Sequence, residues 1–140
     1  MADDTYGSAL DLIARYRARE VSPVEVLQAV QQRAEQVEPA INAFVDTLDE
    51  SALAAAREAE ARYAGRGGGD PRPLEGVPVA TKEEQPIAGL SWRMGSLVTE
   101  GMVADETHPV VERVRAAGGV VHARTTTPEF SCAGVTHTEL

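Results

Sequence analysis

The chain has 140 residues, enough for one domain that buries about 70% of the surface its unfolded form exposes. Only 4% of its residues are aromatic while 43% are hydrophobic, so Ala, Val and Leu must build most of the core. Its formal net charge of -9 argues against nucleic acid or anionic membranes as partners, and no apolar run approaches transmembrane length.

The first half of the chain predicts helices. Residues 8–19 form the first, with Leu10, Ile13 and Tyr16 on one side. The second helix is predicted to begin at residues 22–25. This segment has a capping serine, a proline at the first helical position and a glutamate three residues after the serine. It should end before Pro39. Its expected buried stripe is Val24, Leu27, Val30, Ala34 and Val37.

A short strand is predicted at residues 43–45, followed by a third helix that Asp49 caps and that continues to about Tyr63. Residues 65–73 hold four glycines and two prolines, which indicates a loop. These signals divide the chain into a helical region (1–64), a loop (65–73) and a strand and helix region (74–140).

The last region alternates strands with helices. Residues 77–81 predict a strand, and Glu106 or Thr107 opens a helix that the two glycines at 118 and 119 stop. Its expected inward residues are Val110, Val111, Val114 and Ala117. A strand at residues 120–121 and a helix that starts at Thr127-Pro128 follow. Helices followed by alternating strands and helices indicate an α/β fold with a sheet covered by helices.

Lys82 stands at the end of an apolar strand. Most lysines in such a position are solvated, and the residue alone favours that interpretation. An ammonium group that is removed from water loses its proton more easily, and the neutral amine can then act as a base. Serine hydrolases with a lysine base in place of histidine are a known arrangement.

The segment at residues 76–82, Gly-Val-Pro-Val-Ala-Thr-Lys, resembles the Gly-Val-Pro-Val-Ala-Val-Lys-Asp segment of the amidase-signature family. Further similarity follows in the family's order over nearly the whole chain. It covers Ser-Pro-Val-Glu at 22–25, Ile-Asn-Ala-Phe at 41–44, the segment from Ala88 to Ser96, the helix at 109–118 and the threonine turn at 125–130.

This resemblance implies a mixed sheet between helical layers, incomplete here, with residues 1–140 as the amino-terminal part of a single amidase domain. It also implies that Lys82 is the base of a Ser–cis-Ser–Lys triad, and that Phe130, Ser131 and Cys132 contribute to substrate binding. The family's serine and glycine-rich loop and its nucleophile would lie beyond Leu140, so we expect the 140-residue chain alone to be inactive. Two departures concern the site: Glu83 replaces the usual Asp, and residues 92–94 are larger than is common.

Other residues give weaker signals. Ser131 and Cys132 are equally well explained as small residues in the first turns of a helix. Cys132 could serve as a nucleophile only beside an activating base, and the nearness of His137 in sequence does not supply one. The three histidines lack metal-ligand spacing, and the family resemblance implies neither a metal nor another cofactor.

The function that the family resemblance implies is hydrolysis of a small carboxylic amide to an acid and ammonia or an amine. The A subunit of a tRNA-dependent amidotransferase and a non-catalytic truncated remnant remain open. The threonine-rich turn and the lack of basic patches favour a free-standing amidase, and the full-length enzyme could be a homodimer. The lone cysteine and the acidic start, which has no apolar signal segment, favour the cytoplasm.

Overall fold

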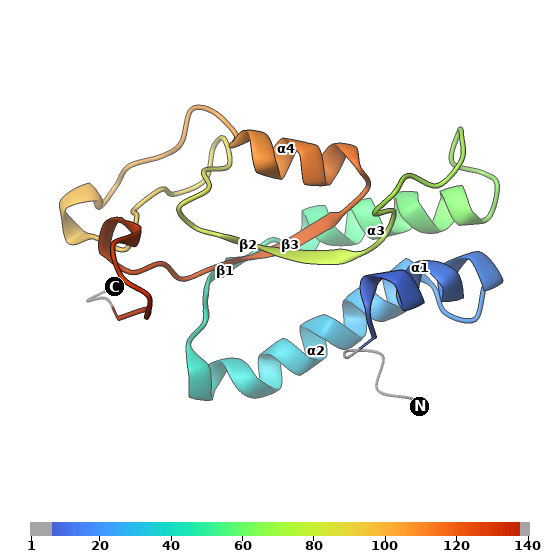
Figure 1. The fold of residues 1–140 in the computed structure, drawn as a ribbon, viewed down its shortest axis with the longest axis horizontal. Helices are drawn as coiled ribbons and strands as arrows, with labels where there is room; N and C mark the ends of the chain where they lie inside the picture. Colours follow the sequence, from blue (N-terminus) through green and yellow to red (C-terminus); the bar gives the residue numbers. More distant parts are fainter. Residues whose placement is uncertain (1–6, 138–140) are drawn as a thin grey trace.

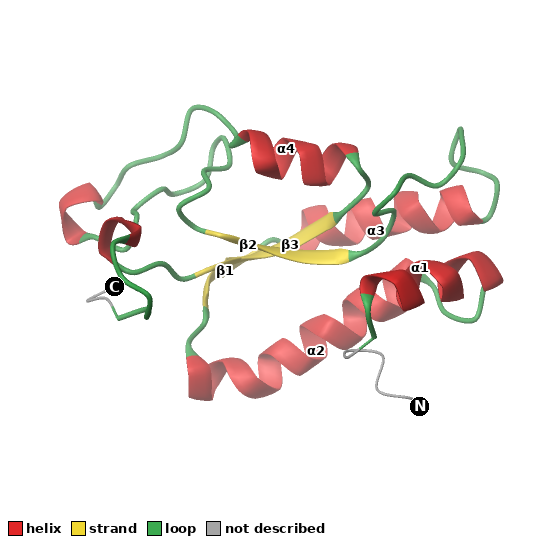
Figure 2. Cartoon of the chain, viewed as in Figure 1, coloured by secondary structure: helices red, strands yellow, loops and turns green. Residues whose placement is uncertain are grey.

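The computed structural model describes residues 7–137 and shows a small sheet between helices (Figure 1). Helix α4 (Pro109–Ala116) covers one face of the sheet, and the three amino-terminal helices, within residues 9–63, lie on the other (Figure 2). Neighbouring residues of the central strand pack on opposite faces of the sheet. Val120 packs with Leu27, Ala52 and Ala56, whereas Val121 packs with Ile87 and Val111. This alternation is what a strand buried on both faces requires. The acidic start of the chain lies outside the described residues.

Helix α1 (Ala9–Ala18) is capped by Ser8, whose side chain accepts a hydrogen bond from the backbone N–H of Asp11. The predicted inward side was partly wrong. Leu12 and Tyr16 are buried, while Leu10 is 80% exposed. The Tyr16 hydroxyl donates to the carbonyl of Gly76 at 3.2 Å, which ties this helix to the start of the Lys82 strand.

Helix α2 (Pro23–Ile41) begins with the predicted capping box, in which Ser22 and Glu25 exchange hydrogen bonds. The prediction that it ends before Pro39 was wrong, because the helix continues through this proline. Proline disfavours helical geometry in the preceding residue but does not forbid it. The Glu38 side chain accepts the backbone N–H of Phe44 and so stabilises the turn beyond the helix. Val26, which was not predicted, is fully buried beside Leu27, while the rest of the predicted stripe is half-buried.

Strand β1 (Phe44–Thr47) and helix α3 (Asp49–Tyr63) follow as expected. Asp49 is not the cap, since Leu48 holds that position and makes no side-chain capping bond. The Asp49 carboxylate instead accepts hydrogen bonds from Gln31 and Thr47. None of the helices within residues 7–137 has the length and apolar composition needed to cross a bilayer.

Strands β2 (Pro78–Lys82) and β3 (Val120–Thr125) complete a three-stranded mixed sheet in the order β1-β3-β2. Strand β3 is central, antiparallel to β1 and parallel to β2, and it extends well past the predicted Val120-Val121. The register pairs Lys82 with Thr125, so both parallel strands end at the same edge of the sheet.

A buried arginine fastens the sheet at this end. Arg124 is fully buried in β3 and forms an ion pair with Asp46 of β1. It also donates to the side-chain and backbone oxygens of Ser91. A buried guanidinium needs such partners, because leaving it unpaired is costly. Arg124 thereby joins β1, β3 and the loop after β2.

Helix α4 (Pro109–Ala116) starts at His108, which caps it through Nδ1. Val111 is buried as predicted, but Val110 is 42% exposed. The helix predicted after Thr127-Pro128 is only a short 3-10 turn, Glu129–Ser131. Phe130 and Ser131 have left-handed backbone angles, with φ values of 48° and 56°, and L residues cannot continue a right-handed helix in that conformation. A second 3-10 turn spans Leu97–Thr99.

Candidate functional site

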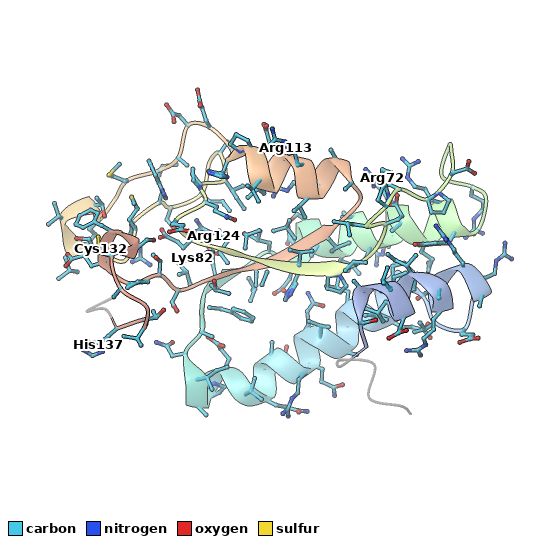
Figure 3. All side chains as sticks on the ribbon, in the orientation of Figure 1. Arg72, Lys82, Arg113, Arg124, Cys132 and His137 are labelled. Atoms are coloured by element: carbon cyan, nitrogen blue, oxygen red, sulfur yellow. The ribbon has the colours of Figure 1, made fainter. Side chains whose placement is uncertain are left out.

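Lys82 is the only lysine of the chain, and it ends β2 at the edge of the sheet where β3 also ends (Figure 3). Segments that leave the carboxyl ends of neighbouring parallel strands meet at that edge. The loop after β2 and the threonine turn after β3 therefore come together here, although Lys82 and Ser131 are 49 residues apart in sequence.

The lysine amine has two partners. Its Nζ lies 3.2 Å from Glu84 Oε2 and 3.3 Å from Ser131 Oγ. The Ser131 hydroxyl is also 2.7 Å from Thr127 Oγ1. We call Lys82, Glu84, Thr127 and Ser131 the lysine cluster. It places a nitrogen base and two hydroxyls in one hydrogen-bonded chain, which is the arrangement that proton transfer requires.

The two carboxylates after Lys82 have different environments. Glu84 is 34% exposed, and hydrogen bonds from Ser131 and Lys82 lower its pKa below the ordinary value, so it remains a carboxylate at neutral pH. Glu83 is buried, and its Oε1 accepts the backbone N–H of Arg93 at 2.5 Å. The two side chains have separate partners, since Glu83 accepts the Arg93 N–H and Glu84 accepts from Lys82.

Several bonds fasten the threonine turn to the loop after β2. Phe130 donates its backbone N–H to the carbonyl of Met94, and the Ser96 hydroxyl donates to Glu129. Gly95 has φ of +66°, and a Cβ at this position would lie 2.4 Å from the carbonyl oxygen of Thr127. Glycine is therefore required for the two loops to approach this closely.

The backbone of this turn is strained, since two successive L residues, Phe130 and Ser131, are left-handed. Such conformations cost about 1–3 kcal/mol each and concentrate at functional sites. Here the strain directs the Ser131 hydroxyl toward the lysine.

A hollow of about 250 Å³ lies beside the lysine cluster and includes part of it. We call it the site hollow. It is lined by Asn42, Phe44, Val45, Glu83, Arg93, Gly95, Thr126 and Thr127.

The sequence-predicted site residues are only partly brought together. Ser131 contacts Lys82, but Phe130 is 44% exposed and Cys132 is exposed. Within residues 7–137 the Cys132 thiol has one hydrogen bond, to the carbonyl of Phe130 at 3.3 Å. Figure 3 shows Cys132 and His137 as separate groups.

Glu84 and Thr127 were missed as members of the cluster. The threonine turn was predicted from the sequence, but no sequence pattern indicated which of its hydroxyls would contact Lys82 or Ser131. Those contacts depend on the left-handed residues that follow the turn. Across the described residues 7–137, no group of three or more His, Cys, Asp or Glu side chains is arranged to hold a metal ion.

Comparison with known proteins gives a consistent result. The family model described as Amidase matches residues 25–140. The A subunit of the glutamyl-tRNA(Gln) amidotransferase from Carboxydothermus hydrogenoformans is 38% identical over 126 residues, covering 90% of this chain and 26% of that protein. An indoleacetamide hydrolase from Bradyrhizobium diazoefficiens is 36% identical over 133 residues, covering 95% of this chain and 25% of that protein.

Solved structures confirm the expected fold class. A fatty acid amide hydrolase matches with a TM-score of 0.81 at 24% identity, over 91% of this chain and 23% of that one. The peptide amidase from Stenotrophomonas maltophilia matches with a TM-score of 0.77 at 29% identity, over 89% of this chain and 26% of that one. The chain therefore spans about a quarter of the length of these relatives.

Proposed function

Because this chain belongs to the amidase family, we propose that residues 1–140 are the amino-terminal part of a single amidase domain that hydrolyses carboxylic amides. The observation that carries the proposal is the position of Lys82, whose amine is held at the sheet edge within 3.3 Å of the Ser131 hydroxyl. Lys82 is the proposed base. Small amides are the proposed substrates, and the cytoplasm is the proposed location.

The chemistry follows the family's serine mechanism. The neutral lysine amine accepts a proton, through a second serine, from the nucleophilic serine. The serine oxygen then attacks the amide carbonyl, and the amine leaves with the transferred proton. Water hydrolyses the acyl-serine ester that remains and releases the acid. Both serines are supplied from outside residues 1–140 in this proposal, so this chain contributes the base and its hydrogen-bond partners.

Within the cluster, Glu84 and Ser131 hold the lysine nitrogen at a fixed position. The half-exposed ion pair, with Lys82 36% and Glu84 34% exposed, contributes little to stability, so positioning is its proposed role.

Substitution of Lys82 in the complete protein tests the proposal. Lys82→Ala and Lys82→Arg should each reduce amide turnover at least about a hundredfold, because a guanidinium cannot serve as a base. The melting temperature should change little. Arg113→Gln is the matched control, since it removes one positive charge from the exposed side of α4. Near-normal turnover by Lys82→Arg would show that the lysine is structural.

A second candidate is an amidotransferase A subunit, favoured by the 38% identity to such a protein. The discriminating measurement is whether turnover of simple amides by the complete protein is independent of added partner proteins. Independence supports a free-standing amidase, whereas a strict requirement for partners supports the amidotransferase role. No activity in either assay supports a non-catalytic remnant.

A further inference from the structure

A second hollow, of about 270 Å³, shares Phe44 with the site hollow and is lined by residues of the carboxyl-terminal half of α2, of β1, of β3 and of the start of α3. We call it the α2 hollow. The first half of α2 packs tightly, with Val26 and Leu27 fully buried, while its second half is only half-buried over the sheet. The hollow is lined by Gln31, Ala34, Glu35, Glu38, Phe44, Thr47, Asp49 and His122.

His122 is a polar side chain at the floor of this hollow. It lies in the central strand and is 6% exposed. Its ring and the ring of Phe44 are nearly perpendicular, with their centroids 6.1 Å apart. Among the hydrogen bonds of residues 7–137, none uses a ring nitrogen of His122, so the buried imidazole has unused capacity toward the hollow. Burial lowers its pKa, which Asp49 partly offsets, so the ring is neutral at pH 7 and offers one acceptor nitrogen.

The walls add negative charge. Glu35, Glu38 and Asp49 all line the hollow, and no Lys or Arg does. The Asp49 oxygens are held by Gln31 and Thr47, and one Glu38 oxygen is held by the backbone of Phe44. Glu35 has no such bond among the described residues and is free to turn toward a ligand. Three carboxylates around a small space attract a cation.

We propose that the α2 hollow binds a protonated primary amine with a small apolar body. The ammonium group would donate to His122 and to the Glu35 carboxylate, and the ring of Phe44 would provide a face for the cation and for the apolar body. A metal ion is a poorer fit, because no three side chains within residues 7–137 converge as metal ligands.

The amine site is independent of the lysine cluster, with which the α2 hollow shares no lining residue. The proposal would therefore survive failure of the proposed amidase activity. Phe44 lines both hollows, so an amine in the α2 hollow would also contact the residue that borders the site hollow.

The test measures binding of 2-phenylethylammonium to the 140-residue chain by ligand-observed NMR, with 2-phenylethanol as the neutral counterpart. We expect the ammonium ion to bind at least about tenfold more tightly than the alcohol. Glu35→Gln should weaken ammonium binding about fivefold. His122→Phe, which fills the hollow with an apolar ring, should abolish it. Glu112→Gln, on α4 across the sheet, is the matched control and should leave the affinity unchanged.

Equal affinity for the alcohol and the ammonium ion would overturn the proposal, because it would mean that the hollow is merely apolar. Absence of ammonium binding, or binding that Glu35→Gln leaves unchanged, would overturn it as well. Glu35 is exposed, so this variant is expected to fold even where His122→Phe does not.

Discussion

Gly95 holds the threonine turn against the loop after β2, and substituting it by alanine tests how the lysine cluster is built. The added Cβ would lie 2.4 Å from the carbonyl oxygen of Thr127 and 2.9 Å from the backbone carbon of Pro128. Both atoms belong to backbone that cannot rotate away as a side chain could. The turn must shift, and the shift would carry the Ser131 hydroxyl away from Lys82.

The expected magnitude has two parts. The left-handed φ of +66° costs an alanine about 1 kcal/mol. The steric conflict adds about 1–3 kcal/mol, as overpacking does elsewhere. Gly89→Ala is the matched control, because its φ is +82° but nothing lies within 4 Å of the added Cβ. Gly89→Ala should therefore cost about 1 kcal/mol, and Gly95→Ala about 2–4 kcal/mol.

Urea denaturation of both variants measures this difference. In the complete protein, Gly95→Ala should also lower turnover, whereas Gly89→Ala should not. If the two variants lose the same stability, within about 0.5 kcal/mol, the close approach of the loops is not the constraint inferred here.

Other parts of the molecule give three further predictions. Asp46→Ala should destabilise the chain by about 3 kcal/mol in urea denaturation, because it leaves the guanidinium of Arg124 buried without its carboxylate; a loss below about 1 kcal/mol would contradict this. Burial alone would raise the pKa of Glu75, but Arg72 and Arg62 lower it below its ordinary value, so its stabilising effect is present above the ordinary pKa and is lost as the pH falls through the folded value. Glu75→Gln should therefore flatten the acid limb of a stability-pH profile, and an unchanged profile would refute the assignment. Amide exchange should be faster in residues 79–82 than in β3, because β2 pairs on one side only in the described sheet; equal protection would indicate that β2 has a partner.

Local signals predicted the elements well where the responsible groups are neighbours in sequence. The capping box at Ser22 and Glu25 involves groups three residues apart, and it forms as expected. The position of Lys82 at a strand end followed from the apolar run before it. The family resemblance then supplied the sheet and the expected role of the lysine, which periodicity alone could not.

Predictions failed where a distant segment decides the outcome. Leu10 and Val110 fit their helical stripes but are exposed, because α1 packs on α2 through Leu12 and Tyr16, and α4 packs on the sheet through Val111. The helix after Pro128 does not form, because hydrogen bonds from Phe130 to Met94 and from Ser96 to Glu129 hold the turn in another shape. Those partners are more than 30 residues away, and no local pattern indicates them.

No local pattern indicates that Arg124 is a buried brace either. An arginine near the end of a strand usually reaches solvent, and here it is fully buried against Asp46 and Ser91. These two partners come from β1 and from the loop after β2, so their pairing depends on the sheet order.

This brace explains why the amino-terminal helices matter for a site they do not touch. Lys82 pairs in register with Thr125, the neighbour of Arg124, so the position of β3 sets the position of the lysine. Arg124 donates a hydrogen bond to Asp46 of β1. Strand β1 follows directly after α2, and the Glu38 side chain of α2 accepts the backbone N–H of Phe44, the first residue of β1. A substitution that weakens the pairing of β1 with β3 should therefore also displace the lysine cluster, because β3 sets the position of Lys82. Removal of residues 7–47 should disorder the cluster even though all four of its members remain.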